Sequence, residues 1–246
     1  MIDSILPLAI SSVIANLPSV DKANEETIRN LVMSVVVNSE KILACEKIIS
    51  VCKRLYRKSF FEGTSGNVSV RLSDGSILIT PSAVSKDSLI CSDIVRTDIN
   101  GVVIEGNRKP SSEIKMHLAV YKNRPDIHSV IHAHPPFSVA FCAVDTKINT
   151  TLLAEAMLIL GEVPVVKYAT PSTEEVPDFL VPYLNAHNAF LLANHGLLTF
   201  GSDLEQALTR AETLEFTAKV TAIAKGLGGR MVYLSGAQVA HLFATH

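Results

Sequence analysis

The stretch PSSEIKMHLAVYKNRPDIHSVIHAHP, residues 110–135, holds most of the polar side chains in this sequence that are suited to catalysis. A proline and two serines precede an apolar-periodic segment, which predicts a helix that begins at Glu113 and ends about ten residues later. Turn residues then lead into a short apolar strand that carries His132 and His134. One helix–turn–strand unit therefore brings a carboxylate, two hydroxyls and two imidazoles together.

The composition is typical of a globular protein with one large core. The 246 residues are 48% hydrophobic and 19% charged, without an internal repeat or a low-complexity linker, so we expect a single domain. A net charge of -2 gives no reason to expect nucleic acid or an anionic membrane as a partner. The sequence also lacks tryptophan and any aromatic-plus-basic stripe that would stack on bases.

The N-terminus and the cysteines favour a cytoplasmic location. Residues 1–20 resemble a short apolar helix, but Asp3 stands where a signal peptide has basic residues, and Pro7 and Pro18 interrupt the apolar run. The cysteines have no CxxC motif and no regular spacing, which favours buried, reduced thiols over a disulfide framework. They are Cys45, Cys52, Cys91 and Cys142.

Hydrophobic periodicity and turn signals predict helices and strands in mixed order. Two Asx-Gly turns between alternating apolar runs indicate β-hairpins, which exclude an all-parallel sheet; they are Asp74-Gly75 and Asn100-Gly101. Spacings of three and four predict one or two amphipathic helices over 24–57, with Asn38-Ser39 as the candidate break. Further helices are expected over 136–143, 151–160, 173–185 and 204–225 and after Ser235, with strands over 163–169 and within 189–201.

His132 and His134 are two residues apart in a predicted strand, so their side chains point to the same face. That geometry suits two imidazoles on one metal ion, and a catalytic site needs a third ligand and an open position. His195, in an Asn-His-Gly turn between apolar strands, is the candidate third ligand. The alternative is a pair of histidines whose ring nitrogens are hydrogen-bonded at a sheet edge.

Glu113, Ser111 and Ser112 allow two interpretations at the start of the predicted helix. An acid and a hydroxyl at this position stabilise a helix N-terminus by themselves. If Glu113 faces a metal, burial should raise its pKa toward the range of a general base. Two hydroxyls with backbone N–H groups also suit an anion, and the small polar loops around 63–69 and 80–83 add further donors. The absence of P-loop and Rossmann motifs indicates a small phosphate ester rather than a nucleotide.

Five short motifs, taken in order, resemble those of the class II aldolase/adducin family. They are G-N-V-S at 66–69, T-P-S-A at 80–83, K-P-S-S-E at 109–113, H-A-H at 132–134 and N-H-G at 194–196. This resemblance covers about residues 42–226, which leaves an N-terminal helical extension over 1–40 and a C-terminal tail over 230–246 in one domain, 1–246. It implies an α/β fold, a three-layer α/β/α sandwich with a mixed central sheet. The family's enzymes are typically homotetramers with the site at a subunit interface.

The resemblance also implies a role for each motif residue. His132, His134 and His195 match the family's three Zn²⁺ ligands, a site that Mn²⁺ or Co²⁺ can also occupy, and Glu113 matches its catalytic base. Four further positions match residues that bind the substrate phosphate: Asn67, Ser82, Ser111 and Ser112.

Two departures from the family pattern concern the substrate. Ala83 stands where the resembled fuculose-phosphate aldolases have glycine, and residues 150–160 lack their proton-donating tyrosine. Glu155 is the only polar acid–base candidate in that segment. Tyr233 is a second candidate, since C-terminal tyrosines of the family close over a neighbouring site.

These motifs support three hypotheses. The first is a metal-dependent aldolase, a class II aldehyde-lyase, that cleaves a (deoxy)ketose 1-phosphate to dihydroxyacetone phosphate and an aldehyde. The second is a sugar-phosphate 4-epimerase, dehydratase or decarboxylase of the same family. The third is a non-enzymatic, adducin-like binding protein, against which the complete set of three histidines and Glu113 argues.

Overall fold

A mixed sheet of eight strands forms the centre of the computed structural model, which describes residues 22–246. Its strand order is β4-β3-β2-β1-β5-β8-β7-β6, and all neighbours are antiparallel except β6 and β7. The strands are β1 (Asn67–Arg71), β2 (Ile77–Ile79), β3 (Val95–Thr97), β4 (Val103–Glu105), β5 (Ser129–Ala133), β6 (Val165–Val166), β7 (Ala189–Leu192) and β8 (Gly196–Gly201). The strand that carries His132, β5, thus lies in the interior of the sheet.

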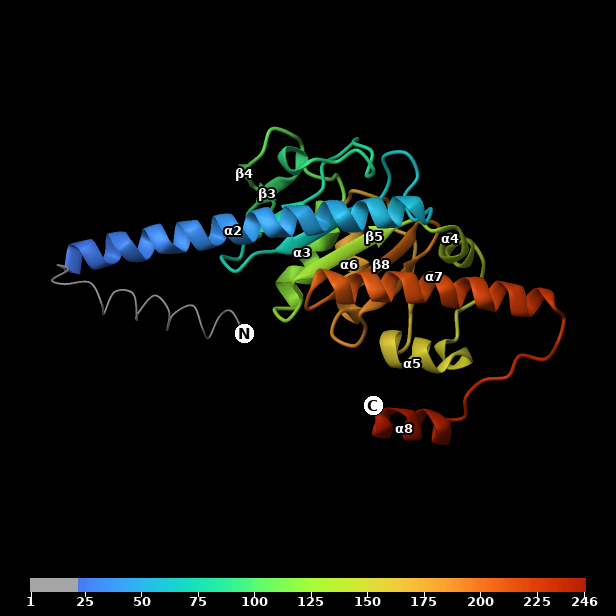
Figure 1. The fold of residues 1–246 in the computed structure, drawn as a ribbon. Helices are drawn as coiled ribbons and strands as arrows, with labels where there is room; N and C mark the ends of the chain where they lie inside the picture. The colour runs from blue at the N-terminus through green and yellow to red at the C-terminus, as the bar shows by residue number, and fades with distance from the viewer. Residues whose placement is uncertain (1–21) are drawn as a thin grey trace.

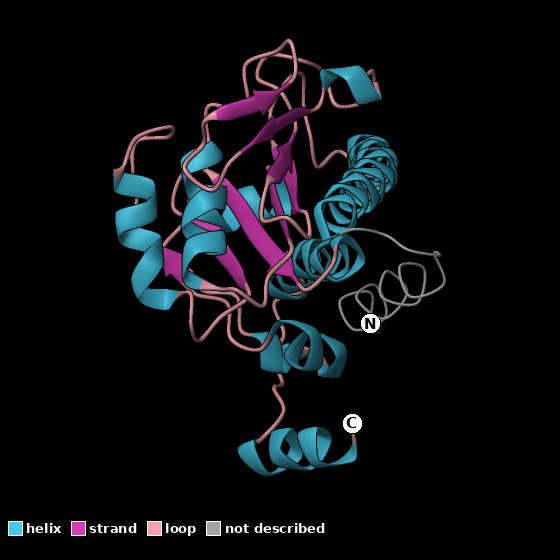
Figure 2. Ribbon diagram, turned by 90° about the vertical axis from the view of Figure 1, so that its left-hand side faces the viewer, coloured by secondary structure: helices cyan, strands magenta, loops and turns pink. Residues whose placement is uncertain are grey.

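Helices cover both faces of the sheet, so the expected three-layer α/β/α sandwich with a mixed sheet is confirmed (Figure 2). One layer contains α2 (Lys22–Arg57), α4 (Pro136–Cys142), α5 (Ala154–Leu160) and α7 (Leu204–Gly226), and the other contains α3 (Ile114–Asn123) and α6 (Glu175–Leu180). Figure 1 shows α2 extending beyond the sheet and α8 (Gly236–Thr245) lying outside the layers. Short 3₁₀ turns are η1 (Cys91–Asp93), η2 (Thr150–Leu152) and η3 (Val181–Tyr183).

A hydrophobic core fills the space on each side of the sheet. Successive side chains of β8 pack on opposite faces of the sheet. Leu197 belongs to the core under α2 and α7, and Leu198 belongs to the core under α3 and α6. This alternation explains why 189–201 is apolar without a polar face, as expected of strands covered on both sides. Full burial of each leucine contributes roughly 1.5–3 kcal/mol to stability.

Both predicted hairpins form. The turn between β1 and β2 places Gly75 at φ +83°, and the turn between β3 and β4 places Gly101 at φ +86°. These left-handed conformations favour glycine because it has no Cβ. Asp74 Oδ1 also accepts a hydrogen bond from the backbone N–H of Ser76 at 2.9 Å, an Asx turn within the first hairpin.

Of the one or two helices predicted over 24–57, the structure has one. α2 runs without a break through 38–39, where Ser39 Oγ donates to Val35 O at 3.0 Å and so satisfies its hydroxyl inside the helix. Two other elements differ from the sequence prediction. The strand expected over 163–169 is only Val165–Val166, at the sheet edge and directly after Pro164, which has no N–H to donate. The helix expected over 173–185 is α6 followed by η3. The helix expected over 1–20 lies outside the described residues.

None of the helices within 22–246 has an apolar stretch long enough to cross a membrane. All four cysteines are free thiols. Cys45, Cys52 and Cys142 are buried as expected, whereas Cys91 is exposed, so the prediction of burial is wrong for that residue.

Candidate active site

Three histidines converge where β5 ends beside the β7–β8 turn. His132 lies on β5, His134 follows the strand, and His195 occupies the turn. The ring centroids of His132 and His134 are 4.6 Å apart, and those of His132 and His195 are also 4.6 Å apart. One ligand nitrogen from each ring lies within 4.8 Å of the others, so the structure brings together the three histidines named from the sequence.

The turn that presents His195 depends on its two neighbours. Asn194 has φ +55°, a left-handed conformation that asparagine tolerates better than most residues. A Cβ on Gly196 would lie 2.4 Å from His134 Cδ2 and 2.5 Å from Ala133 O. Only glycine fits this close approach, so the N-H-G sequence is required for the histidines to meet.

The hydrogen bonds of His132 fix which nitrogen faces the cluster. Its Nδ1 lies 2.8 Å from Leu197 O, and a carbonyl oxygen can only accept, so Nδ1 carries the proton. Nε2 therefore presents a lone pair, 2.8 Å from His134 Nε2. Burial lowers the pKa of His132 to about 4 and that of His134 to about 3. Both rings are neutral near pH 7, the form that binds a metal.

Glu113 is the N-cap of α3 and lies against this cluster. Its Oε1 is 3.1 Å from His195 Nε2, its Oε2 is 3.4 Å from His132 Nε2, and Asn67 Nδ2 donates to Oε2 at 2.8 Å. Burial raises the pKa of Glu113, but His132, His195 and the Asn67 hydrogen bond together hold it well below its ordinary range. The expected upward shift is therefore wrong, because partners that favour the carboxylate outweigh desolvation.

The donor atoms fit a catalytic divalent metal. The lone pair of His132 and the carboxylate of Glu113 converge without a positive charge between them, and a cation at this point would compensate both. Three imidazoles beside a carboxylate suit Zn²⁺ with an open coordination position, and Mn²⁺ and Co²⁺ also accept nitrogen and oxygen ligands.

A buried polar chain behind Glu113 was not identified as part of the site from the sequence. His117 is completely buried; its Nε2 donates to Asn67 Oδ1, and its Nδ1 is 2.7 Å from Ser69 Oγ. Burial lowers the pKa of His117 to about 4. The chain orients the Asn67 amide so that its NH₂ faces Glu113. The spacing of four residues between Glu113 and His117 on a helix was the one available signal.

A cavity of about 300 Å³ opens beside the histidines; we call it the loop pocket. Its lining residues are Thr64, Ser65, Gly66, Asn67, Pro81, Ser82, Ala83, Ser111, Ser112, Glu113 and His134. It thus contains all four residues that the sequence assigned to phosphate binding, together with Glu113. The volume suits a small phosphorylated molecule.

The serines of the loop pocket hold its walls together. Ser82 Oγ donates to Pro110 O at 2.9 Å and accepts from the Ser112 backbone N–H at 2.9 Å, which ties the loop after β2 to the start of α3. Ser111 Oγ accepts from the Glu113 N–H at 3.3 Å. Within residues 22–246, the backbone N–H groups of Gly66 and Ala83 make no hydrogen bond and can donate to an anion.

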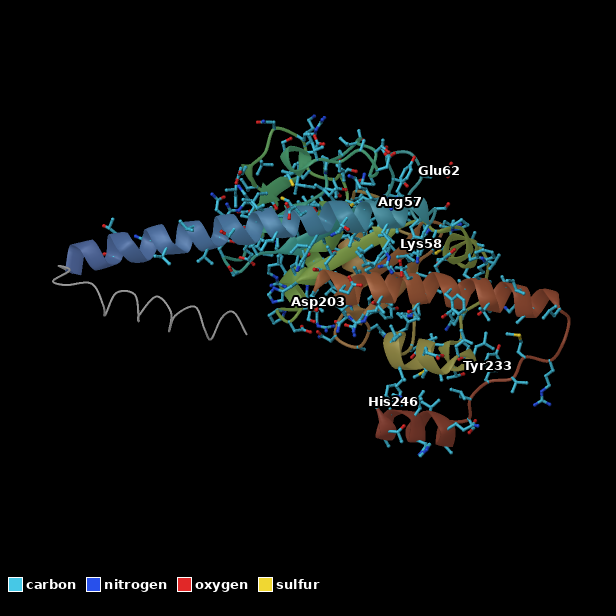
Figure 3. The ribbon with its side chains drawn as sticks, in the orientation of Figure 1. Arg57, Lys58, Glu62, Asp203, Tyr233 and His246 are labelled. Carbon is cyan, nitrogen blue, oxygen red and sulfur yellow. The ribbon has the colours of Figure 1, made fainter. Side chains whose placement is uncertain are left out.

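Glu155 and Tyr233, the two acid–base candidates, do not line the loop pocket of their own chain. Glu155 is exposed in the first turn of α5. Tyr233 is 41% exposed on the extended segment between α7 and α8 (Figure 3). Neither residue is therefore placed to act on a ligand in the loop pocket of its own chain.

Several known proteins are similar to this chain over most of its length. Residues 46–222 match the family described as class II aldolase and adducin N-terminal domain. An L-fuculose phosphate aldolase from Methanococcus maripaludis is 34% identical over 74% of this chain and 97% of its own length. A 3-oxo-tetronate 4-phosphate decarboxylase from Escherichia coli is 30% identical over 80% of this chain and 93% of its own. A solved L-fuculose 1-phosphate aldolase superposes with a TM-score of 0.75 at 33% identity, covering 82% of this chain and 95% of its own. The chain belongs to the class II aldolase and adducin family.

Proposed function

We propose that this protein is a metal-dependent aldolase that cleaves a (deoxy)ketose 1-phosphate to dihydroxyacetone phosphate and an aldehyde. The observation that carries this proposal is the position of Glu113, whose carboxylate contacts the histidine cluster and also lines the loop pocket. In this proposal Glu113 transfers protons between a metal held by the three histidines and a small anion in the loop pocket. Two relatives named for sugar-phosphate lyase chemistry support the same class of substrate.

His132, His134 and His195 would hold a divalent metal, which supplies electrostatic stabilisation for the negative charge that develops on the substrate. In the cleavage direction the C3–C4 bond breaks, its electron pair stays with C3, and the C4 hydroxyl passes its proton to a second acid–base group, which returns it to solvent, as C4 becomes the aldehyde carbon. C3 gains a proton through Glu113, which takes that proton from solvent. In the reverse direction ionised Glu113 removes that proton, and its lowered pKa keeps it ionised at neutral pH.

The loop pocket would hold the phosphate group. The backbone N–H groups of Gly66 and Ala83 and the exposed hydroxyl of Ser112 are free to donate to phosphate oxygens, while Ser82 and Ser111 keep the walls in place. Asn67 lies between the two parts of the site. A phosphate held in the same pocket as Glu113 would orient the reacting carbons toward its carboxylate, and such orientation is a major source of rate acceleration.

The test is product formation from a panel of ketose 1-phosphates with protein loaded with Zn²⁺, Mn²⁺ or Co²⁺. We expect release of dihydroxyacetone phosphate from at least one deoxyketose 1-phosphate. A coupled assay, in which a second enzyme reduces the released dihydroxyacetone phosphate, measures this product. If none of the panel yields dihydroxyacetone phosphate with any of the three metals, the aldolase proposal is wrong.

The variant Glu113→Gln should lose turnover but keep its metal. Removing the proton-transferring group should lower kcat by roughly 10²–10⁴-fold. Metal content measured by elemental analysis, together with the melting temperature, should match the parent protein. Glu46→Gln, which removes an exposed carboxylate on α2, is the matched control. Loss of metal from Glu113→Gln would mean that Glu113 acts first as a ligand.

The second candidate function is another reaction of this family, and the decarboxylase relative favours it. Epimerisation, dehydration or decarboxylation would use the same metal and phosphate sites with a different bond broken. NMR analysis of the products formed from the same panel distinguishes these reactions. An adducin-like binding protein would retain no bound divalent metal after purification without chelators.

We also propose that the enzyme is a cytoplasmic homotetramer in which a neighbouring copy completes the site. Glu155 and Tyr233 would then supply the acid–base group for the C4 hydroxyl, since neither lines the pocket of its own chain. Light scattering should give four times the 26.6 kDa chain mass. A monomeric, fully active enzyme would contradict this arrangement.

A further inference from the structure

Lys86 is a buried cation with no assigned role. Only 1% of it is exposed, and its ammonium donates to two backbone carbonyls, Thr64 O at 2.9 Å and Val84 O at 2.8 Å. Thr64 belongs to one loop of the loop pocket, and Val84 directly follows Ala83 of the other. The charge of Lys86 therefore lies behind the pocket wall and joins both of its loops.

This charge has no counter-ion. Within 22–246, no carboxylate forms an ion pair with Lys86, and its hydrogen-bond acceptors are neutral. A buried ion without a partner costs several kcal/mol after relaxation of its surroundings. Burial lowers the pKa of Lys86, while Cys52 and Glu113 act in the opposite direction. Glu113 thus compensates the ammonium only from a distance, without forming an ion pair, and an anion held in the loop pocket would add to this compensation.

The loop pocket is the place where that anion would bind. It has free backbone donors but no lysine or arginine among its lining residues, so Lys86 is the cation whose hydrogen bonds reach its walls. The low polarity of a buried site strengthens the attraction between this ammonium and an anion bound between the two loops that it joins. A dianion gains twice as much from this field as a monoanion.

We propose that Lys86 is a positioning residue that gives the loop pocket its affinity for a dianionic phosphate group. It does so from behind the wall, by holding the two loops together and by supplying the positive charge that the lining residues lack. This inference rests on the proposed assignment of the loop pocket to the substrate phosphate. The substrate class it selects is a phosphate monoester, in preference to an unphosphorylated sugar or a carboxylate.

The test is calorimetric binding of inorganic phosphate to metal-loaded protein at pH 7.5, freed of excess metal. Lys86→Met removes both the charge and the hydrogen bonds, whereas Lys86→Gln removes the charge but keeps an NH₂ donor. Both variants should bind phosphate at least about tenfold more weakly than the parent protein. Lys122→Met, which removes an exposed lysine charge from the far end of α3, should leave the phosphate Kd unchanged.

The comparison of the two variants separates charge from structure. If Lys86→Gln binds phosphate as tightly as the parent protein while Lys86→Met does not, Lys86 only holds the loops and the proposal is overturned. Parent-like binding by both variants also overturns it. Metal content and melting temperature, measured alongside, show whether each variant is folded.

A measurement on the unaltered protein decides the question if both variants fail to fold. Between pH 8 and pH 10 phosphate stays dianionic, and the neighbouring Cys52 keeps its proton because burial raises its pKa to about 12. Glu113 remains ionised over this range. Because burial lowers the pKa of Lys86, phosphate affinity should fall as the pH rises, and an affinity that is still unchanged at the highest pH at which the protein stays folded would refute the role of the charge.

These measurements do not depend on turnover. Phosphate binding that requires Lys86, in a protein that releases no dihydroxyacetone phosphate, would support the inference while rejecting the aldolase proposal. If the protein catalyses aldol cleavage but its phosphate affinity does not depend on Lys86, the aldolase proposal is supported and the role of Lys86 is rejected.

Discussion

At the scale of single residues, the site depends on positions that accept only one side chain. His132 has a fixed proton position because Leu197 O can only accept. Gly196 leaves room for the His134 ring, and the Asn67 amide has its carbonyl oxygen committed to His117 and its NH₂ to Glu113. Each of these residues can be changed separately, with a different expected loss.

Gly196→Ala should disrupt the metal centre. The added Cβ would meet the His134 ring and Ala133 O at 2.4 and 2.5 Å, so the strand end or the ring must move. Metal content by elemental analysis should fall below one ion per chain, and overpacking should cost about 1–3 kcal/mol of unfolding free energy. Gly226→Ala, where a Cβ meets nothing within 4 Å, is the control. Full metal occupancy in Gly196→Ala would contradict the assigned geometry.

Asn67→Ala should separate two roles of one residue. If Asn67 mainly orients Glu113, loss of a hydrogen bond to a charged group, about 1.5–3 kcal/mol, should lower kcat by roughly 10- to 100-fold. If it mainly binds phosphate, KM should rise while kcat is unchanged. The 2.8 Å bond to Glu113 predicts the first outcome. Asn123→Ala, whose amide donates to Ala119 O at the end of α3, is the control for steady-state kinetics.

The sequence identified the histidines and Glu113 because strand alternation and short motifs determine where such residues point. It did not identify the roles of His117 and Lys86, since both depend on which distant backbone or side-chain groups surround a buried polar atom. The direction of the Glu113 pKa shift was wrong for the same reason. Burial and the approach of His132 were foreseeable, but the hydrogen bond from Asn67 and the summed effect of these partners on the carboxylate were not.

At the scale of elements, the strands and helices with strong local signals were predictable. The hairpins at Gly75 and Gly101 follow from their turn chemistry, and α7 begins at Leu204 as expected, after an Asp203 cap whose side chain accepts from the Gln206 N–H. Elements whose ends depend on tertiary contacts were less predictable. The edge strand β6 is limited to its two-residue pairing with β7, and α2 continues through 38–39.

The loop after β2 provides a prediction at this scale. Ala83 has φ +56°, a left-handed conformation that costs a residue with a Cβ about 1–2 kcal/mol. Ala83→Gly should remove this strain, and after the greater entropy of unfolded glycine is subtracted it should raise the unfolding free energy by roughly 0.5 kcal/mol. Ala186→Gly, in a turn without a positive φ, should instead lower it. Urea denaturation of both variants gives the comparison.

At the scale of the whole molecule, buried histidines should make the metal-free protein sensitive to acid. His117, His132 and His134 have folded-state pKa values of about 4, 4 and 3, below the ordinary value of 6.5. The unfolded chain therefore takes up protons first as pH falls. The unfolding free energy should be highest above pH 6.5 and decline by a few kcal/mol toward pH 4. Denaturant titrations at pH 7, 6, 5 and 4 measure this slope, and a constant unfolding free energy would contradict it.

The strand order of the sheet has a consequence for how the protein folds. β1 to β4 pair with their neighbours in sequence, so that half can form early from local contacts. His132 and His195 approach each other only when β5 pairs with β8, which is distant in sequence. We therefore expect His132 and His134 to meet His195 late in folding, because the pairing of β5 with β8 joins segments that are distant in sequence. A metal ion would have no complete set of ligands before that step. Metal binding should consequently lengthen the lifetime of the folded state rather than accelerate its formation.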